Sequence, residues 1–302
     1  MTPMETLVDS LAPGEGQRSG AAPKKDTGDT GAIRGRPTFL ALFQDLLSSL
    51  KAPGFWLYGA WIDTSLRHRS QALGAFWMVA GTLAFVLLLG TLYSNVLLRP
   101  GSDSQIYYAH LGTGFVLWIL IQQSLQQSAR LYKKNKSMIQ NGYVKYVDYV
   151  LRMFSGHLIS FAYNLLIVAG VILLTPVQLT TADFVLLLTV PLFMLALLGM
   201  CFFLSVVAAR YPDVAELMQT VLRLFFFVTP IIWMPFMGRG AVFGAFIYLN
   251  PFYYLLEIIR GPLVYGVVPW FEIGIVAAAV PVIWLLAALA YARAKPYIPL
   301  WI

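Results

Sequence analysis

Six long apolar stretches, separated by polar connections, dominate the pattern of hydrophobic and polar positions along the chain. Each holds about 20 mostly apolar residues, the length that a helix needs to cross a hydrocarbon core about 30 Å thick. Backbone groups in lipid must find their hydrogen bonds within the segment, so the pattern predicts helices. The predicted spans are 76–98, 106–125, 157–174, 184–208, 219–237 and 273–292.

The connection between the fifth and sixth predicted spans is also apolar and could suggest a seventh helix over 241–259. Asn250-Pro251 falls inside that window and Gly261-Pro262 follows it, and proline breaks or kinks a continuous helix. We therefore predict two short re-entrant or interfacial half-helices, 241–248 and 251–264. Non-helical backbone at membrane depth is tolerated only where protein covers it or where it lines a cavity.

Glu257 and Arg260 are the charged residues of the second predicted half-helix. Their i,i+3 spacing places them on one helical face, where they can pair. A structural ion pair is the preferred interpretation, and a role in an outer gate is the alternative.

Two amphipathic stretches, separated by Pro53-Gly54, lie in residues 37–71 ahead of the first span. The first places five apolar residues on one helical face: Phe39, Leu42, Phe43, Leu46 and Leu50. The second has an aromatic front and a basic end at Arg67-His68-Arg69. This order is typical of a helix in the headgroup layer, and an ordinary packed helix is the alternative.

Composition indicates that the chain lies in a membrane, and the distribution of charge predicts its orientation there. Charged residues make up 12% of the chain and hydrophobic residues 59%, whereas soluble domains carry about 25% charged residues. With the N-terminus in the cytoplasm, all of the 21 basic residues except Arg99, Arg239 and Arg260 fall on the cytoplasmic side. This asymmetry predicts that both termini are cytoplasmic. The net charge of +7 therefore reflects topology and not nucleic-acid binding.

The first 36 residues are rich in Gly, Pro, Ser, Thr and Asp and have no apolar core, which predicts a disordered cytoplasmic tail over 1–36. The six-span domain then covers 72–302. The single cysteine, Cys201, lies inside the fourth predicted span, so it has no partner for an intrachain disulfide. A small buried apolar role is expected for it.

The spans hold almost no groups that could couple transport to an ion gradient. Asp183 and Glu272 lie at span boundaries, and no acidic residue lies at a span midpoint, where proton and sodium sites usually place one. The sequence also has no Gly-x-x-x-x-Gly-Lys-Ser/Thr phosphate loop. If the chain transports a substrate, its energy is expected to come from a separate subunit.

The predicted cytoplasmic connections contain basic residues that could dock such a subunit. They are Arg67 and Arg69 before the first span, Lys133, Lys134 and Lys136 after the second, and Arg210 with Asp213 after the fourth. The alternative is that these loops are basic only because they face lipid headgroups. Pro212 suits the first turn of a new helix, whose positive N-terminal end Asp213 would complement.

Aromatic residues make up 15% of the chain, and two groups lie inside predicted spans. Phe85 and Tyr93 share a face of the first span, and Phe226, Trp233 and Phe236 share one of the fifth. Helix packing or lipid contact is the ordinary interpretation. The alternative is a conduit, because the apolar faces of sugar rings stack on aromatic surfaces while their hydroxyls stay hydrated.

Four stretches, taken in order, resemble one family. Residues 63–77 resemble the interface helix and first-span start of type-2 ABC exporter permeases, most of all those of the polysaccharide-export branch. Residues 209–214 resemble the short Arg/Asp element after the fourth span. Residues 229–233 and 250–260 resemble the fifth span and the outer re-entrant element, with Asn250, Pro251, Glu257 and Arg260 in place.

The resemblance implies a homodimer of six-span, all-α subunits in the bacterial inner membrane, driven by two copies of a separate ATPase. ATP and Mg would be bound by that partner, and this chain would bind no cofactor or metal. The first and fifth spans would line a channel that carries a lipid-linked, O-antigen-like polysaccharide from the cytoplasmic to the outer face. One alternative is a drug or small-lipid exporter of the same superfamily. A remote one is a membrane-embedded lipid-linked transferase, for which the isolated His68, His110 and His157 offer no convergent acid–base set.

Overall fold

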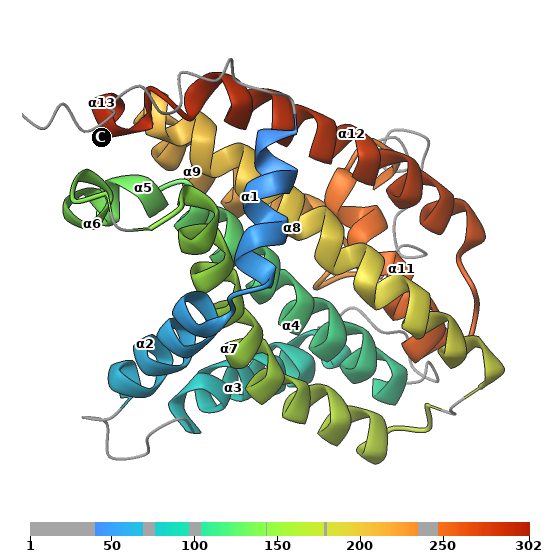
Figure 1. The fold of residues 1–302 in the computed structure, drawn as a ribbon. Helices are drawn as coiled ribbons and strands as arrows, with labels where there is room; N and C mark the ends of the chain where they lie inside the picture. Colours follow the sequence, from blue (N-terminus) through green and yellow to red (C-terminus); the bar gives the residue numbers. More distant parts are fainter. Residues whose placement is uncertain (1–39, 69–75, 97–103, 143, 178–179, 235–246) are drawn as a thin grey trace, which may run out of the picture. The chain divides into compact units, whose positions relative to one another are not determined.

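The computed structural model describes residues 40–68, 76–96, 104–142, 144–177, 180–234 and 247–302. Contacts divide the chain into two units, Met1–Arg36 and Pro37–Ile302, and the description below concerns the second. The predicted tail over 1–36 lies outside the described residues. The described part of the second unit is built of helices and contains no strand (Figure 1).

Two groups of helices make up the described unit. The first half of the chain forms α1 (Ala41–Leu50), η1 (Gly54–Tyr58), α2 (Gly59–His68), α3 (Phe76–Val96), α4 (Ser104–Ser128), α5 (Leu131–Lys134) and α6 (Lys136–Gln140). The second half forms α7 (Tyr146–Leu174), η2 (Thr181–Val185), α8 (Leu186–Arg210), α9 (Val214–Val228), α11 (Pro251–Tyr265), α12 (Trp270–Ala294) and α13 (Ile298–Trp301).

Among the described residues, 3 helical segments have the length and apolar composition needed to cross a membrane: Tyr146–Leu174, Thr181–Arg210 and Trp270–Ala294. They correspond to the third, fourth and sixth predicted spans. The apolar segment Val79–Tyr93 of α3 is shorter. The second predicted span is helical as α4, but the second half of this helix is rich in Gln and Ser. The count of six spans stays a prediction.

The fifth predicted span, 219–237, is wrong as a continuous helix, because α9 ends at Val228. Thr229 precedes Pro230 and adopts an extended backbone with ψ 134°, as a residue before proline prefers. Residues 229–234 continue without helix. At 15 residues, α9 is about 22 Å long, which is short for a hydrocarbon core of about 30 Å.

The helix α4 is the most enclosed part of the unit, and α3, α7, α8, α9 and α11 all contact it. Tyr107, Leu111, Trp118 and Ile121 on this helix are almost completely buried. Because protein covers α4 on most sides, its polar residues need not face lipid.

The helices α8 and α12 pack closely along their length (Figure 1). A side chain at Gly199 would come within 2.9 Å of Ile283, so glycine is needed for this approach. The Trp284 indole on α12 donates a 3.1 Å hydrogen bond to the Leu195 backbone oxygen on α8.

The first amphipathic stretch packs against protein, because α1 contacts α7 and α12. Leu42 is buried, and Phe43 and Leu46 lie against the main core, as the predicted face requires. Leu50 is the exception and is 49% exposed. Phe39 lies outside the described residues.

The second amphipathic stretch forms η1 and α2, and its large apolar residues Leu57, Tyr58, Trp61 and Leu66 are all more than half exposed. Its position in the headgroup layer stays a prediction with which these exposed side chains agree.

The half-helix predicted over 251–264 is confirmed as a helix by α11. The Asn250 side chain accepts a hydrogen bond from the backbone N–H of Phe252, and Pro251 occupies the first helical position. Gly266 ends the helix with φ 63°, a left-handed conformation that glycine adopts without strain. Most of the other half-helix, 241–248, lies outside the described residues, and re-entry into the membrane stays a prediction.

Candidate functional site

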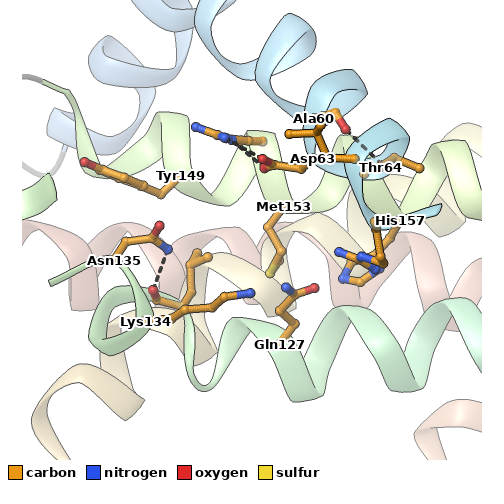
Figure 2. A pocket seen from close by; sticks show the side chains of 14 residues that line it. Ala60, Asp63, Thr64, Gln127, Lys134, Asn135, Tyr149, Met153 and His157 are labelled. Atoms are coloured by element: carbon orange, nitrogen blue, oxygen red, sulfur yellow. Dashed lines mark hydrogen bonds and ion pairs between the residues drawn. The ribbon is translucent and has the colours of Figure 1, made fainter. Parts of the chain in front are cut away.

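A cavity of about 370 Å³ lies between α2, α5 and α7, at the predicted cytoplasmic end of the α4–α7 pair. Its lining is mostly polar and basic, and Figure 2 shows Asp63 and Thr64 on one side with Gln127 and Lys134 on the other. Arg67 and His157 also line it.

An ion pair fixes one wall of this cavity. Arg152 on α7 donates two hydrogen bonds to the Asp63 carboxylate on α2, with N–O distances of 2.7 and 2.8 Å. The Arg152 guanidinium also lies 5.4 Å from the centre of the Phe55 ring, within cation–π range. The two-point geometry joins α2 to α7 through their side chains.

Arg67 and Lys134 differ from Arg152, because neither has an acidic partner among the described residues. The Nε2 atom of His157 is buried and has no hydrogen-bond partner among the residues that the structure describes. The cavity thus combines two uncompensated positive charges with an unsatisfied ring nitrogen, a combination suited to an anionic group.

A second cavity, of about 460 Å³, continues along α3, α4 and α7 and shares Arg67 with the first. It contains the amides of Gln123 and Asn164 and the rings of Phe85 and Phe115. The first cavity includes Gln127, one turn after Gln123 of the second on α4, and Gly156, one turn before Ser160 of the second on α7. The two cavities therefore follow each other along the same pair of helices.

A row of aromatic rings starts in the second cavity. Phe85 on α3 stacks on Phe115 of α4 with ring centres 4.2 Å apart. Phe115 lies 6.1 Å from Phe226 of α9, and Phe226 lies 6.0 Å from Trp118. Two predicted channel residues, Phe85 and Phe226, are thus connected through Phe115. Phe115 itself was not predicted, because helical spacing relates only residues of one helix and these three rings lie on three helices.

The other predicted channel residues do not form one face with Phe226. Trp233 lies in the non-helical segment after α9, and its indole donates a 3.0 Å hydrogen bond to the Phe227 backbone oxygen. The predicted stripe is therefore wrong, because it requires the helix to continue past Thr229. Tyr93 packs on a separate cluster around Tyr107 and Leu111. Phe236 lies outside the described residues.

The outer element carries a buried polar network centred on Arg260, whose side chain is 0% exposed. Arg260 pairs with Glu257 at 2.7 Å, so the predicted ion pair forms. The guanidinium also donates a 2.6 Å hydrogen bond to the Pro230 backbone oxygen and lies 3.3 Å from His110 Nε2. It therefore stabilises the backbone that α9 leaves unpaired where it ends.

Further side chains hold the same segment. The Tyr107 hydroxyl donates to the Ile232 oxygen at 2.6 Å, and His110 Nε2 lies 3.1 Å from the Trp233 oxygen. The Asn250 amide donates to the Thr229 hydroxyl at 2.7 Å. These bonds meet the requirement that non-helical backbone in a membrane protein be satisfied by neighbouring groups.

The remaining predicted coupling residues lie in several places. Lys133 and Lys136 are exposed on α5 and α6. Arg210 lies at the end of α8, where its guanidinium is 5.0 Å from the centre of the Trp301 ring. Asp213 is the N-cap residue of α9 but makes no side-chain cap hydrogen bond. Pro212 precedes the helix and does not form its first turn, which corrects the prediction for that position. Arg69 lies outside the described residues.

Tyr132 on α5, next to the basic residues Lys133 and Lys134, is buried, and its hydroxyl lies 3.5 Å from the Tyr146 backbone oxygen. Burial raises the pKa of the Tyr132 phenol above its usual value, so this side chain is neutral and holds α5 in place by packing. No group of three His, Cys, Asp or Glu residues that could hold a metal ion occurs in the described ranges.

Residues 58–264, more than half of the chain, match the family model of the ABC-2 type transporter. The chain therefore belongs to the ABC-2 type transporter family of membrane proteins. It is a transport subunit of the membrane, and the family relationship assigns it no catalytic role. No curated protein compared with the chain gives a match.

Proposed function

We propose that this chain is the transmembrane subunit of an ATP-driven exporter that moves a lipid-linked, O-antigen-like polysaccharide from the cytoplasmic to the outer face of the bacterial inner membrane. The observation that carries the proposal is the row of rings through Phe85, Phe115 and Phe226, which begins in a cavity lined with amides and hydroxyls. Ring faces stack on the C–H faces of sugars, while amides bind their hydroxyls.

The energy source in this proposal is a separate ATPase, present in two copies on a homodimer of this chain. ATP and Mg are bound by the ATPase, and both termini of this chain are cytoplasmic. The exposed residues Lys133, Lys136, Arg210 and Asp213 offer it a charged surface. Arg67 belongs to the cavity mouth, and the Asp63–Arg152 pair carries the motion of α2 into α7.

The second candidate function is export of a drug or small lipid, and one observation favours it. A smaller cavity of about 210 Å³, between α4, α7, α8 and α11, is lined almost entirely by apolar side chains such as Val116, Phe161 and Phe193. Such a lining suits an apolar molecule. Thr113 supplies its one polar side chain, too few for a glycan, so the two candidates use different cavities.

Co-expression with a partner ABC ATPase tests the proposal. Vesicles that contain both proteins are expected to move a polyprenyl diphosphate-linked glycan in the presence of ATP, and vesicles that contain either protein alone are not. Transport by this chain alone, or ATP-dependent movement of dyes but of no glycan, would contradict the proposal.

A further inference from the structure

The two cavities share Arg67 and follow each other along α4 and α7, and together they are called the groove here. Basic and ring nitrogens lie at its mouth, on Arg67, Lys134 and His157. Amides and hydroxyls follow, on Gln123, Ser160 and Asn164, and Phe115, stacked on Phe85, lies farthest from the mouth along α4. From Gln127 to Phe115, α4 rises about 18 Å along this groove, which is long enough for a phosphate group and more than one sugar ring.

Besides the Tyr149 hydroxyl, which belongs to the lining of the first cavity, two buried atoms in the groove lack a hydrogen-bond partner among the described residues. One is His157 Nε2 at the mouth, on a side chain that is 6% exposed. The other is the Asn164 side-chain oxygen, on a residue that is 4% exposed, while its amide nitrogen donates to the Ser160 backbone oxygen at 2.9 Å. Buried polar atoms are normally paired, so each indicates a group that binds there.

We infer that this groove binds the head of a phosphate-linked glycan lipid, with the phosphate at Arg67, Lys134 and His157 and the first sugars between Asn164 and the Phe85–Phe115 pair. A prenyl or acyl chain does not fit the inner part, because it would leave the Asn164 oxygen unpaired. A sugar hydroxyl donates to that oxygen, while the ring face stacks on the aromatic wall. This inference rests on the proposed function and specifies where the substrate head binds.

The position within one subunit has a consequence for uptake. The groove walls come from α2, α3, α4, α5 and α7 of a single chain, so binding of the lipid head requires neither the ATPase nor a second copy. The Asp63–Arg152 pair lies in the same wall as the phosphate position. Movement of α2 would therefore reshape the mouth around a bound head.

Binding to the full chain alone tests the inference. The chain is placed in nanodiscs of phosphatidylcholine, and retention of undecaprenyl diphosphate-linked disaccharide is measured by native mass spectrometry. R67Q/K134Q is expected to weaken retention about tenfold or more, because two charge-assisted contacts are lost. The matched control is K133Q/K136Q, which removes the same charge from exposed positions that do not line the groove, and it is expected to bind like the wild type.

A second variant separates the sugar position from the phosphate position. N164L is expected to weaken binding of the disaccharide lipid several-fold and to leave binding of undecaprenyl phosphate unchanged, since that lipid has no sugar. R67K/K134R keeps both charges and is expected to restore most of the retention. Melting temperatures of all variants identify any that fail to fold.

The outcomes distinguish this inference from the proposed function. Equal retention by R67Q/K134Q and K133Q/K136Q overturns the groove assignment, even if ATP-dependent glycan export is observed. Equal retention of phosphatidylglycerol and the disaccharide lipid also overturns it and assigns the groove to a bilayer lipid. Selective, groove-dependent retention supports it, even where transport assays with the ATPase fail.

Discussion

At the scale of single residues, Phe115 and Asn164 decide what kind of molecule the groove can bind. Phe115 stacks on Phe85 and meets Phe226, so it connects aromatic residues of two other helices. Asn164 is 4% exposed, and its unsatisfied side-chain oxygen lies on the polar side of the same groove. A ring and an amide facing one space are the groups a sugar needs, and neither alone would be informative.

Replacing Phe115 with leucine tests the aromatic row. F115L keeps most of the volume, so the free energy of unfolding is expected to fall by about 1 kcal/mol. Glycan export by vesicles that hold this chain and the ATPase is expected to fall several-fold, because the stacking surface between Phe85 and Phe226 is interrupted. The control is F203L, at a residue that is 36% exposed on α8. Equal export rates in the two variants would show that the row takes no part in transport.

At the scale of single helices, polar contacts from neighbouring helices stabilise the point where a helix ends. The helix α9 ends where Thr229 meets Pro230, and the segment that follows is held by Arg260, Tyr107 and His110 from two other helices. The buried Arg260 is thus the centre of a connection between α9 and α11. Its cost of desolvation is offset only while Glu257 and the Pro230 oxygen remain in place.

Removing the Arg260 side chain tests this connection. R260M is expected to reduce the free energy of unfolding by about 3–5 kcal/mol, because it leaves the partly buried Glu257 and the Pro230 backbone oxygen without their partner. R260M/E257L is expected to recover part of the loss. Thermal unfolding in nanodiscs measures both, and R223M, at an exposed arginine on α9, is expected to stay within about 0.5 kcal/mol of the wild type. Wild-type stability of R260M would mean that the network is dispensable.

At the scale of the whole molecule, the boundary at residue 36 and the packing of α1 indicate which N-terminal residues contribute to the stability of the unit Pro37–Ile302. Asp45 on α1 accepts hydrogen bonds from Tyr291 at 2.7 Å and from Lys295 at 2.5 Å, near the end of α12. A segment at the start of the described unit is thereby joined to its last long helix. The helices that line the two cavities, α2, α3, α4, α5 and α7, lie between these two in the chain.

Two truncations test this organisation. Deletion of residues 1–36 is expected to leave the melting temperature unchanged, since contacts divide the chain at this position. Deletion of residues 1–52 also removes α1, uncovers the surface under buried Leu42 and leaves Lys295 without Asp45. It is expected to lower the melting temperature by about 5 °C or more. Scanning calorimetry of the two proteins in the same nanodiscs provides the comparison, and equal temperatures would contradict the anchoring role of α1.

Much of this protein follows from its sequence. Long apolar runs and few charges leave the helix as the local structure that satisfies the backbone in lipid, so the third, fourth and sixth spans and the half-helix after Asn250 were predictable. The i,i+3 pairing of Glu257 with Arg260 was predictable for the same reason, because it lies within one helix.

Pro230 is a helix breaker that the sequence contains, but α8 and α12 continue through Pro191 and Pro281, so only the tertiary structure decided that α9 ends there. The tertiary structure also decided which residues share a surface. Apolar residues continue past Thr229, so hydropathy could not show that partners on α4 and α11 make a break there stable. Helical spacing likewise relates residues within one helix, whereas the groove brings together Arg67, Phe85, Phe115 and Asn164 from four. Their grouping depends on how helices pack, a non-local property that no single segment encodes.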